Sequence, residues 1–241
     1  MSAAGRRIDV QGLTKRFGEV TAVADLSFSV RPGKVTGFLG PNGSGKTTTL
    51  RMILGLVSPT AGTATIGGVR YADLTHPARI VGAVLDRADA HPACTARNHL
   101  RIYAAMAGLR PERVDAVLDQ AGLTAHADRR TGGFSTGMRQ RLGLATALLG
   151  DPGVLLLDEP SNGLDPQGMA WLRELLAGLA AEGRTVLISS HVLSELEQIA
   201  DEAVVIHEGR LVATGSVKEL TASTGSLEQT FLTLTSQGAE Q

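Results

Sequence analysis

The sequence is poor in aromatic residues and has almost no net charge. Phe, Trp and Tyr together make up 3% of the 241 residues, and the formal net charge at pH 7 is −1. Proteins that bind single-stranded nucleic acid need aromatic platforms for base stacking and a cationic surface for the phosphates. The composition therefore argues against nucleic acid as a partner.

Cysteine, lysine and long apolar runs are also scarce. Cys94 is the only cysteine, which excludes an internal disulfide and a cysteine zinc site. The longest wholly apolar stretches, such as residues 154–157, fall far short of the ~20 residues that a membrane helix needs. Residues 1–7 show no secretion signal. We expect a soluble cytoplasmic chain, for which any membrane role requires a partner.

Hydrophobic residues make up 43% of the chain, and their spacing changes along it between strand-like and helix-like patterns. Two strands are expected in residues 8–30, with a turn at Gly18-Glu19, and a small hairpin in residues 59–68. Short apolar strands are expected at residues 35–39, 81–85, 154–157, 186–188 and 203–206, with helices at 46–54, 167–181 and 192–200. Strands that alternate with helices predict an α/β fold with a mainly parallel sheet covered on both faces.

Residues 95–149 break this alternation and have helical spacing. One expected face contains Leu100, Tyr103, Ala104 and Ala107, and another contains Val114, Val117, Leu118 and Ala121. A second long helix is expected over 138–149, and a packed helix with Leu227, Phe231 and Leu234 in the tail. We predict a single domain, 1–241, with its core at 1–85 and 151–215, a helical subdomain at 86–150 and a helical tail at 216–241.

A glycine-rich loop lies between an apolar strand and a helix. Residues 40–47 read GPNGSGKT, which matches the GxxxxGK[ST] pattern of a P-loop. Glycines allow successive N–H groups to turn toward a phosphate, and the helix N-terminus adds positive potential. Lys46 is expected to reach the β- and γ-phosphates, and Thr47 to offer its hydroxyl to Mg²⁺. The predicted ATP contacts are Gly40, Pro41, Asn42, Gly43, Ser44, Gly45, Lys46, Thr47 and Thr48.

Two carboxylates and a histidine follow later strands. Asp158 and Glu159 end an apolar strand. In a P-loop protein an acid at this point holds Mg²⁺ through water, which is the role predicted for Asp158. Glu159, one residue on, is placed to orient or deprotonate the attacking water. The alternative for Glu159 is a solvated loop acid. His191 follows the strand at 186–189, and the carboxyl ends of parallel strands meet at one sheet edge. We therefore predict that Lys46, Glu159 and His191 form the catalytic group, with Thr47 and Asp158 as metal ligands.

With these motifs in this order, the chain resembles an ABC transporter ATPase subunit over nearly its whole length. Residues 134–138, FSTGM, lie where that family has its LSGGQ signature, and residues 161–165, SNGLD, match its D-loop. Ser190-His191 matches its switch histidine. The resemblance implies a P-loop NTPase core with an N-terminal antiparallel β-subdomain and an inserted helical subdomain.

The resemblance also implies a head-to-tail dimer that holds two ATP molecules. Each site would combine the P-loop of one chain with Ser135 and Gly137 of the other. Phe17 stands where a tyrosine usually stacks on adenine, which keeps the aromatic face and loses the hydroxyl. A plain core phenylalanine is the alternative at that position.

Three further positions depart from the family pattern. In FSTGM, Thr136 replaces a glycine and Met138 replaces the glutamine. Asp86 stands in place of the Q-loop glutamine after the strand at 81–85. An acid accepts hydrogen bonds from metal-bound water but adds negative charge near a triphosphate and donates none. Two interpretations stay open for Asp86, a Mg²⁺ or coupling residue and a solvated loop acid.

The resemblance predicts a Mg-ATPase that drives a separate polytopic membrane permease docked near residues 86–95. Its variant signature and ending are similar to ATP-binding subunits of drug, antibiotic or polysaccharide exporters, peripheral on the cytoplasmic face of the membrane. The second ATPase chain of the dimer would be another copy of this chain or a similar subunit. The alternatives are a soluble ABC ATPase in cofactor assembly, translation or DNA repair, and a nucleotide-binding regulator without hydrolysis. The motif residues Lys46, Asp158, Glu159 and His191 argue against the regulator.

Overall fold

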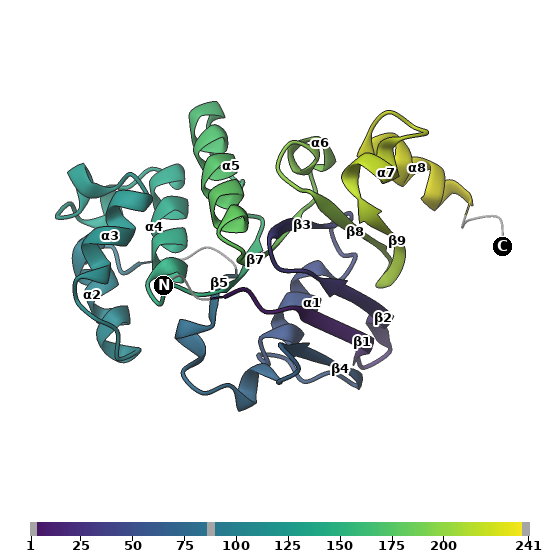
Figure 1. Cartoon of the computed structure of the whole chain (residues 1–241), viewed down its shortest axis with the longest axis horizontal. Coiled ribbons are helices and arrows are strands. Elements are labelled where there is room, and N and C mark those ends of the chain that lie inside the picture. Colours follow the sequence, from purple (N-terminus) through teal and green to yellow (C-terminus); the bar gives the residue numbers. More distant parts are fainter. Residues whose placement is uncertain (1–3, 86–89, 238–241) are drawn as a thin grey trace.

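The strands of this computed structural model, which describes residues 4–85 and 90–237, form two sheets (Figure 1). The first is antiparallel, in the order β2-β1-β4, and the second has the order β5-β6-β7-β3-β8-β9. In the second sheet every pairing is parallel except that of β9 with β8. The strands are β1 (Ile8–Phe17), β2 (Val20–Val30), β3 (Lys34–Leu39), β4 (Ala61–Ile66), β5 (Val81–Val84), β6 (Val154–Asp158), β7 (Thr185–Ser190), β8 (Glu202–His207) and β9 (Arg210–Ser216).

Both faces of the second sheet are covered, because its central strands are apolar on both sides. In β6, Leu155 and Leu157 pack into one buried cluster, whereas Val154 and Leu156 pack into the other. The first cluster includes residues of α5 (Pro166–Ala181) and α6 (Leu193–Glu197), and the second includes residues of α1 (Lys46–Ile53) and the antiparallel sheet. This two-faced burial is the reason that the strand reads as a continuous apolar run.

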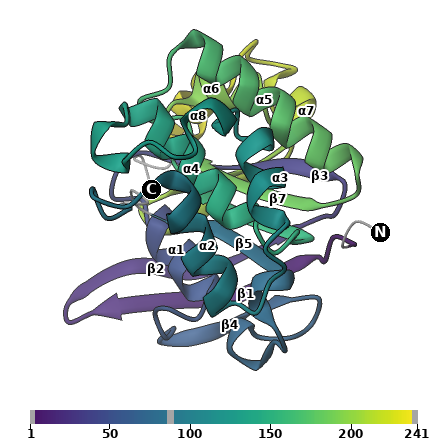
Figure 2. The ribbon, with the colours of Figure 1, turned by 90° about the vertical axis from the view of Figure 1, so that its left-hand side faces the viewer.

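A helical subdomain is inserted between β5 and β6. It contains α2 (Ala96–Met106), α3 (Arg113–Gln120) and α4 (Thr136–Leu148), which lie together at one end of the molecule (Figures 1 and 2). Arg113 donates hydrogen bonds to the carbonyls of Leu148 and Leu149 at 2.9 and 3.2 Å, which ties α3 to the end of α4. Helices α7 (Val217–Thr221) and α8 (Leu227–Gln237) lie at the opposite end. Short 3₁₀ helices span Tyr71–Asp73, Pro77–Arg79, Thr124–His126 and Thr131–Gly133.

The predicted fold class is confirmed, but two local expectations fail and one strand is additional. Residues 59–68 do not form a hairpin; β4 is instead an outer strand that pairs with β1, with Ile8 opposite Ile66. Tyr103 is 47% exposed rather than part of the apolar core face of α2. Strand β9, which pairs with β8, has no counterpart among the expected strands. For β4, pairing with the distant strand β1 outweighs the local pattern.

Candidate functional site

The phosphate loop connects β3 to α1, and two of its glycines cannot carry a side chain. A Cβ on Gly40 would lie 2.4 Å from the carbonyl oxygen of Ile206. Gly45 has φ 98°, and its Cβ would lie 2.5 Å from the carbonyl oxygen of Ala22. The loop is thus pressed between β8 and β2, which fixes its path ahead of the helix. Inside it, the Ser44 hydroxyl is buried and has no hydrogen-bond partner among the described residues, as expected of a group placed to bind a ligand.

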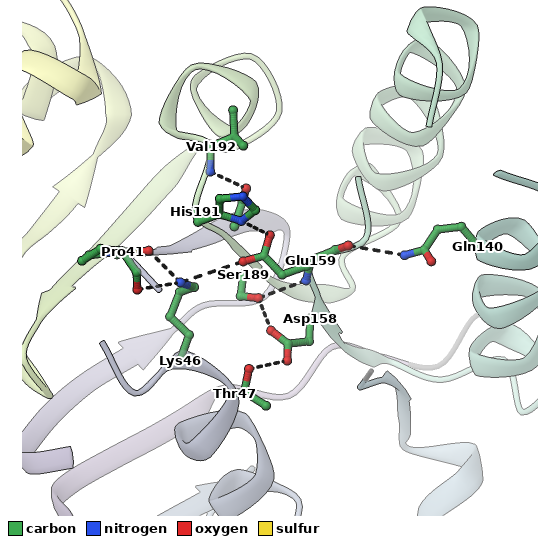
Figure 3. A network of polar contacts seen from close by, with 11 residues as sticks. Pro41, Lys46, Thr47, Gln140, Asp158, Glu159, Ser189, His191 and Val192 are labelled. Carbon is green, nitrogen blue, oxygen red and sulfur yellow. Dashed lines mark hydrogen bonds and ion pairs between the residues drawn. The ribbon is translucent and has the colours of Figure 1, made fainter. Parts of the chain in front are cut away.

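Lys46 is 6% exposed and lies folded along this loop (Figure 3). Its Nζ donates to the carbonyls of Gly40 and Pro41 at 2.6 and 3.1 Å and lies 3.9 Å from Glu159 Oε1. Burial lowers the pKa of the Lys46 ammonium, while the charges of Glu159 and Asp158 raise it. A buried cation of this kind favours additional negative charge beside it, which a phosphate supplies.

The two carboxylates at the end of β6 have different partners. Asp158 Oδ2 accepts a hydrogen bond from Thr47 Oγ1 at 2.7 Å, and Oδ1 accepts one from Ser189 Oγ. Glu159 Oε2 pairs with His191 Nδ1 at 2.8 Å, and the Glu159 N–H donates to Ser189 Oγ at 3.1 Å. A continuous chain of polar contacts therefore joins Thr47 on α1 to His191 across the ends of β6 and β7 (Figure 3).

Ser189 contacts both acidic residues, the carboxylate of Asp158 and the backbone N–H of Glu159, and sequence reasoning did not identify it. In the parallel pairing of β6 with β7, Asp158 lies directly opposite Ser189. Its hydroxyl is fully buried and serves as donor to one acid and acceptor from the backbone of the other. The sequence places Ser189 at the end of an apolar strand, which is the only sign of its role. Which residue it faces depends on the order of the strands in the sheet.

Ser135 and Gly137 lie apart from this cluster. Ser135 is the N-cap of α4, and its Oγ accepts a hydrogen bond from the Met138 N–H at 3.2 Å. Among the described contacts, neither Ser135 nor Gly137 has one to the phosphate loop. They line a separate hollow of about 460 Å³ with residues that follow Glu159. Its lining is Ser135, Thr136, Gly137, Met138, Arg141, Gly163, Leu164, Asp165, Gln167 and Gly168.

Thr136, which replaces a glycine of the signature, contacts Gly163. The Thr136 methyl packs so closely on Gly163, which has φ 76°, that a Cβ on Gly163 would lie 2.5 Å from it. Thr136 therefore restricts position 163 to glycine.

Phe17, at the end of β1, is 52% exposed, and Lys15 Nζ lies 4.9 Å from its ring centre. An exposed ring is available for stacking, unlike a core phenylalanine.

The candidate metal ligands Thr47 and Asp158 adjoin the phosphate loop, whereas Asp86 lies outside the described residues. In residues 4–85 and 90–237, no group of three or more His, Cys, Asp or Glu side chains could hold a metal ion. A hydroxyl and one carboxylate leave most of a Mg²⁺ coordination sphere to water and phosphate, as is usual for this ion. The oxygen donors present fit such a shared site.

Comparison with protein families decides the identity. A family model described as ABC transporter matches residues 23–162. The chain belongs to the ABC transporter family. The Nod factor export ATP-binding protein I of Ralstonia nicotianae is 44% identical over 88% of this chain and 68% of its own length. The bacitracin transport ATP-binding protein BcrA of Bacillus licheniformis is 43% identical over 85% of this chain and 68% of its own length.

Solved structures agree with this assignment. The ATP-binding subunit of an ABC transporter superposes with a TM-score of 0.84 at 30% identity, covering 95% of this chain and 99% of that one. This ABC protein is therefore the ATP-binding subunit of an ABC transporter and an ATPase, as the sequence motifs predicted. Within the described part of the chain, none of its helices is long and apolar enough to cross a membrane.

Substitution of Ser189 by alanine in this ABC ATPase is expected to lower ATP turnover about tenfold. The change leaves one oxygen of Asp158 and the Glu159 N–H without their partner, at a cost of roughly 1–3 kcal/mol. Steady-state ATPase rates and urea unfolding measure the two effects. Thr185→Val is the matched control, since Thr185 Oγ1 donates to the Arg6 carbonyl at 2.8 Å at the other end of β7. Both variants should lose stability, and equal turnover in both would contradict a role for Ser189 at the site.

Proposed function

We propose that this chain hydrolyses Mg-ATP as a head-to-tail dimer and thereby drives a separate polytopic permease in export. The observation that supports hydrolysis most is the convergence of Lys46, Thr47, Asp158, Glu159 and His191 at one end of the sheet (Figure 3). A carboxylate for water, a buried cation for phosphate and oxygen ligands for a metal are the parts that phosphoryl transfer requires.

ATP binding is assigned to the loop and to Phe17. The loop N–H groups and the N-terminus of α1 bind the phosphates, and Lys46 neutralises charge on the β- and γ-phosphates. Phe17 stacks on the adenine with its exposed face. The complete proposed set is Phe17, Gly40, Pro41, Asn42, Gly43, Ser44, Gly45, Lys46, Thr47 and Thr48, with Ser135 and Gly137 from the partner chain.

Magnesium is assigned to the hydroxyl of Thr47 and the carboxylate of Asp158. These groups lie 2.7 Å apart and are both oxygen donors. When bound there, the ion would neutralise the negative charge that develops on the transferring phosphate. Asp86 is a further candidate ligand or coupling residue. Its extra negative charge beside a triphosphate is the reason to test it separately from Asp158.

Glu159 is the proposed general base, and His191 orients it. The imidazole Nδ1 holds one carboxylate oxygen at 2.8 Å, so the other oxygen is left to face Lys46 and an attacking water. The His191 side chain is 38% exposed, which leaves part of its ring accessible to the γ-phosphate. General-base catalysis of this kind contributes about 10²- to 10⁴-fold in rate.

The separation of the two proposed phosphate-binding elements within one chain supports the head-to-tail dimer. Ser135 and the first turn of α4 line a hollow of their own, with no described contact to Lys46. A helix N-terminus with free N–H groups favours an anion. In a head-to-tail dimer the signature of one chain faces the ATP on the P-loop of the other. The second chain is a copy of this one or a similar subunit.

The permease is proposed to dock on the helical subdomain, residues 86–150. Helix α2 follows the 86–95 segment and exposes Ile102, Tyr103 and Met106 by 54, 47 and 80%, on one side of the helix. Apolar side chains grouped at helical spacing indicate a surface that another helix covers. The chain would then be peripheral on the cytoplasmic face of the membrane. Residues 1–85 and 151–215 form the catalytic core in this scheme, and 216–241 the tail.

Purification of the tagged chain from detergent-solubilised membranes should recover a polytopic protein, identified by mass spectrometry. Met106→Glu should lower that recovery at least fivefold, because it places a charge on the proposed apolar contact. Leu56→Glu is the control, since Leu56 is 66% exposed outside the helical subdomain. Recovery of soluble partners alone would instead favour an ABC ATPase without a transport role.

A further inference from the structure

Gln140 connects the signature helix to the proposed catalytic loop of the same chain. It lies on α4, five positions after the N-cap Ser135, and is partly buried. Its Nε2 donates a hydrogen bond of 3.4 Å to the carbonyl oxygen of Glu159 (Figure 3). The helix that begins at the signature thus contacts the backbone of the residue assigned to activate water.

The backbone of Glu159 needs such contacts. Its φ of 50° lies in the left-handed region, which a residue with a side chain keeps only where its surroundings fix it. The Glu159 N–H donates to Ser189 Oγ, and its carbonyl accepts from the Asn162 N–H at 3.2 Å and from Gln140. Ser189 and Asn162 belong to the core and to the turn itself, so Gln140 supplies the contact from the helical subdomain.

We propose that Gln140 is a positioning residue that couples the signature helix to Glu159 of its own chain. The inference rests on the proposed function. In the head-to-tail dimer, α4 faces the ATP held by the partner, whereas Glu159 acts on the ATP of its own P-loop. A shift of α4 when the partner's ATP arrives would therefore reach Glu159 through Gln140. One amide would connect the two ATP sites within a single chain.

The first test replaces the amide by a side chain of similar length without a donor. Gln140→Met should lower kcat for ATP about fivefold, the equivalent of one ordinary hydrogen bond, and leave KM within twofold. Gln120→Met is the control, because Gln120 is exposed at the end of α3 and its side chain makes no described contact. Unchanged kcat in Gln140→Met would overturn the inference. An inactive wild-type chain would count against the proposed function instead.

Mixed dimers separate this role from a merely structural role in the signature. In each mixture, a Glu159→Gln chain is in large excess, so that every active Glu159 has an inactive partner. In one mixture the active chain carries Gln140→Met, and in the other the Glu159→Gln chain carries it. We expect the fivefold loss only in the first mixture. If Gln140 instead only supports the signature of its own chain, the loss appears in the second mixture. The signature of the Glu159→Gln chain is the one that completes the active site.

A binding measurement decides the case even if dimers with one active site do not turn over. The Glu159→Gln chain and the double variant Glu159→Gln/Gln140→Met are titrated with ATP, and dimer formation is followed by size-exclusion chromatography. The midpoints should agree within twofold, since Gln140 does not contact the γ-phosphate in this scheme. A midpoint more than fivefold higher in the double variant would assign Gln140 to the signature and overturn the coupling.

Discussion

Glu159→Gln is expected to lower ATP turnover by about 10²- to 10⁴-fold, or roughly 3–5 kcal/mol of activation barrier, while ATP binding persists. The amide keeps the shape of the side chain, and the backbone contacts to Ser189 and Asn162 do not involve the carboxylate. The amide has no basicity toward water, however. ATP bound in the closed dimer then cannot be hydrolysed, so the ATP-bound dimer should accumulate and be visible by size-exclusion chromatography.

A charge-matched control distinguishes this effect from the loss of one negative charge. Glu174 is exposed on α5, and Glu174→Gln should turn over ATP at the wild-type rate. If Glu159→Gln also stays within twofold of wild type, Glu159 has no part in the reaction. Loss of ATP binding together with turnover would indicate a folding defect, which urea unfolding of both variants would reveal.

Mixing two inactive variants, Lys46→Ala and Ser135→Arg, should recover ATP-dependent dimerisation. The first loses the buried cation of the phosphate loop, and the second puts a bulky side chain at the N-cap of α4. Each homodimer then has two incomplete sites. A mixed dimer pairs the good loop of one chain with the good signature of the other and restores one complete site. Hydrolysis should return as well if one site can act alone.

The control for this experiment removes a different N-cap. Ser135→Arg also deletes a cap, which costs about 1 kcal/mol of stability by itself. Ser216 caps α7 in the same way, with its Oγ accepting from the Glu219 N–H at 3.1 Å, so Ser216→Arg should stay active. If the mixture forms no more dimer than either variant alone, Ser135 does not act across the dimer. Its role is then that of a helix cap only.

The phosphate loop and the two carboxylates could be predicted because their signals are local. A strand, a glycine loop and a helix succeed one another within residues 35–54, and only glycine meets the conformation that Gly45 adopts. The contacts of Ser189 and Gln140 could not be predicted. They join positions that are 31 and 19 residues apart, and no period of hydrophobicity encodes which strand or helix lies beside which.

The sequence by itself determined the motif residues, the alternation of strands and helices, and the family to which they belong. Tertiary structure alone decided that β3 lies between β7 and β8, and that Asp158 stands opposite Ser189. It also decided that β4 pairs with β1, where a hairpin within residues 59–68 was expected. The physical reason is that side-chain periodicity depends on neighbours along the chain, whereas strand order and register depend on which distant apolar faces bury one another best.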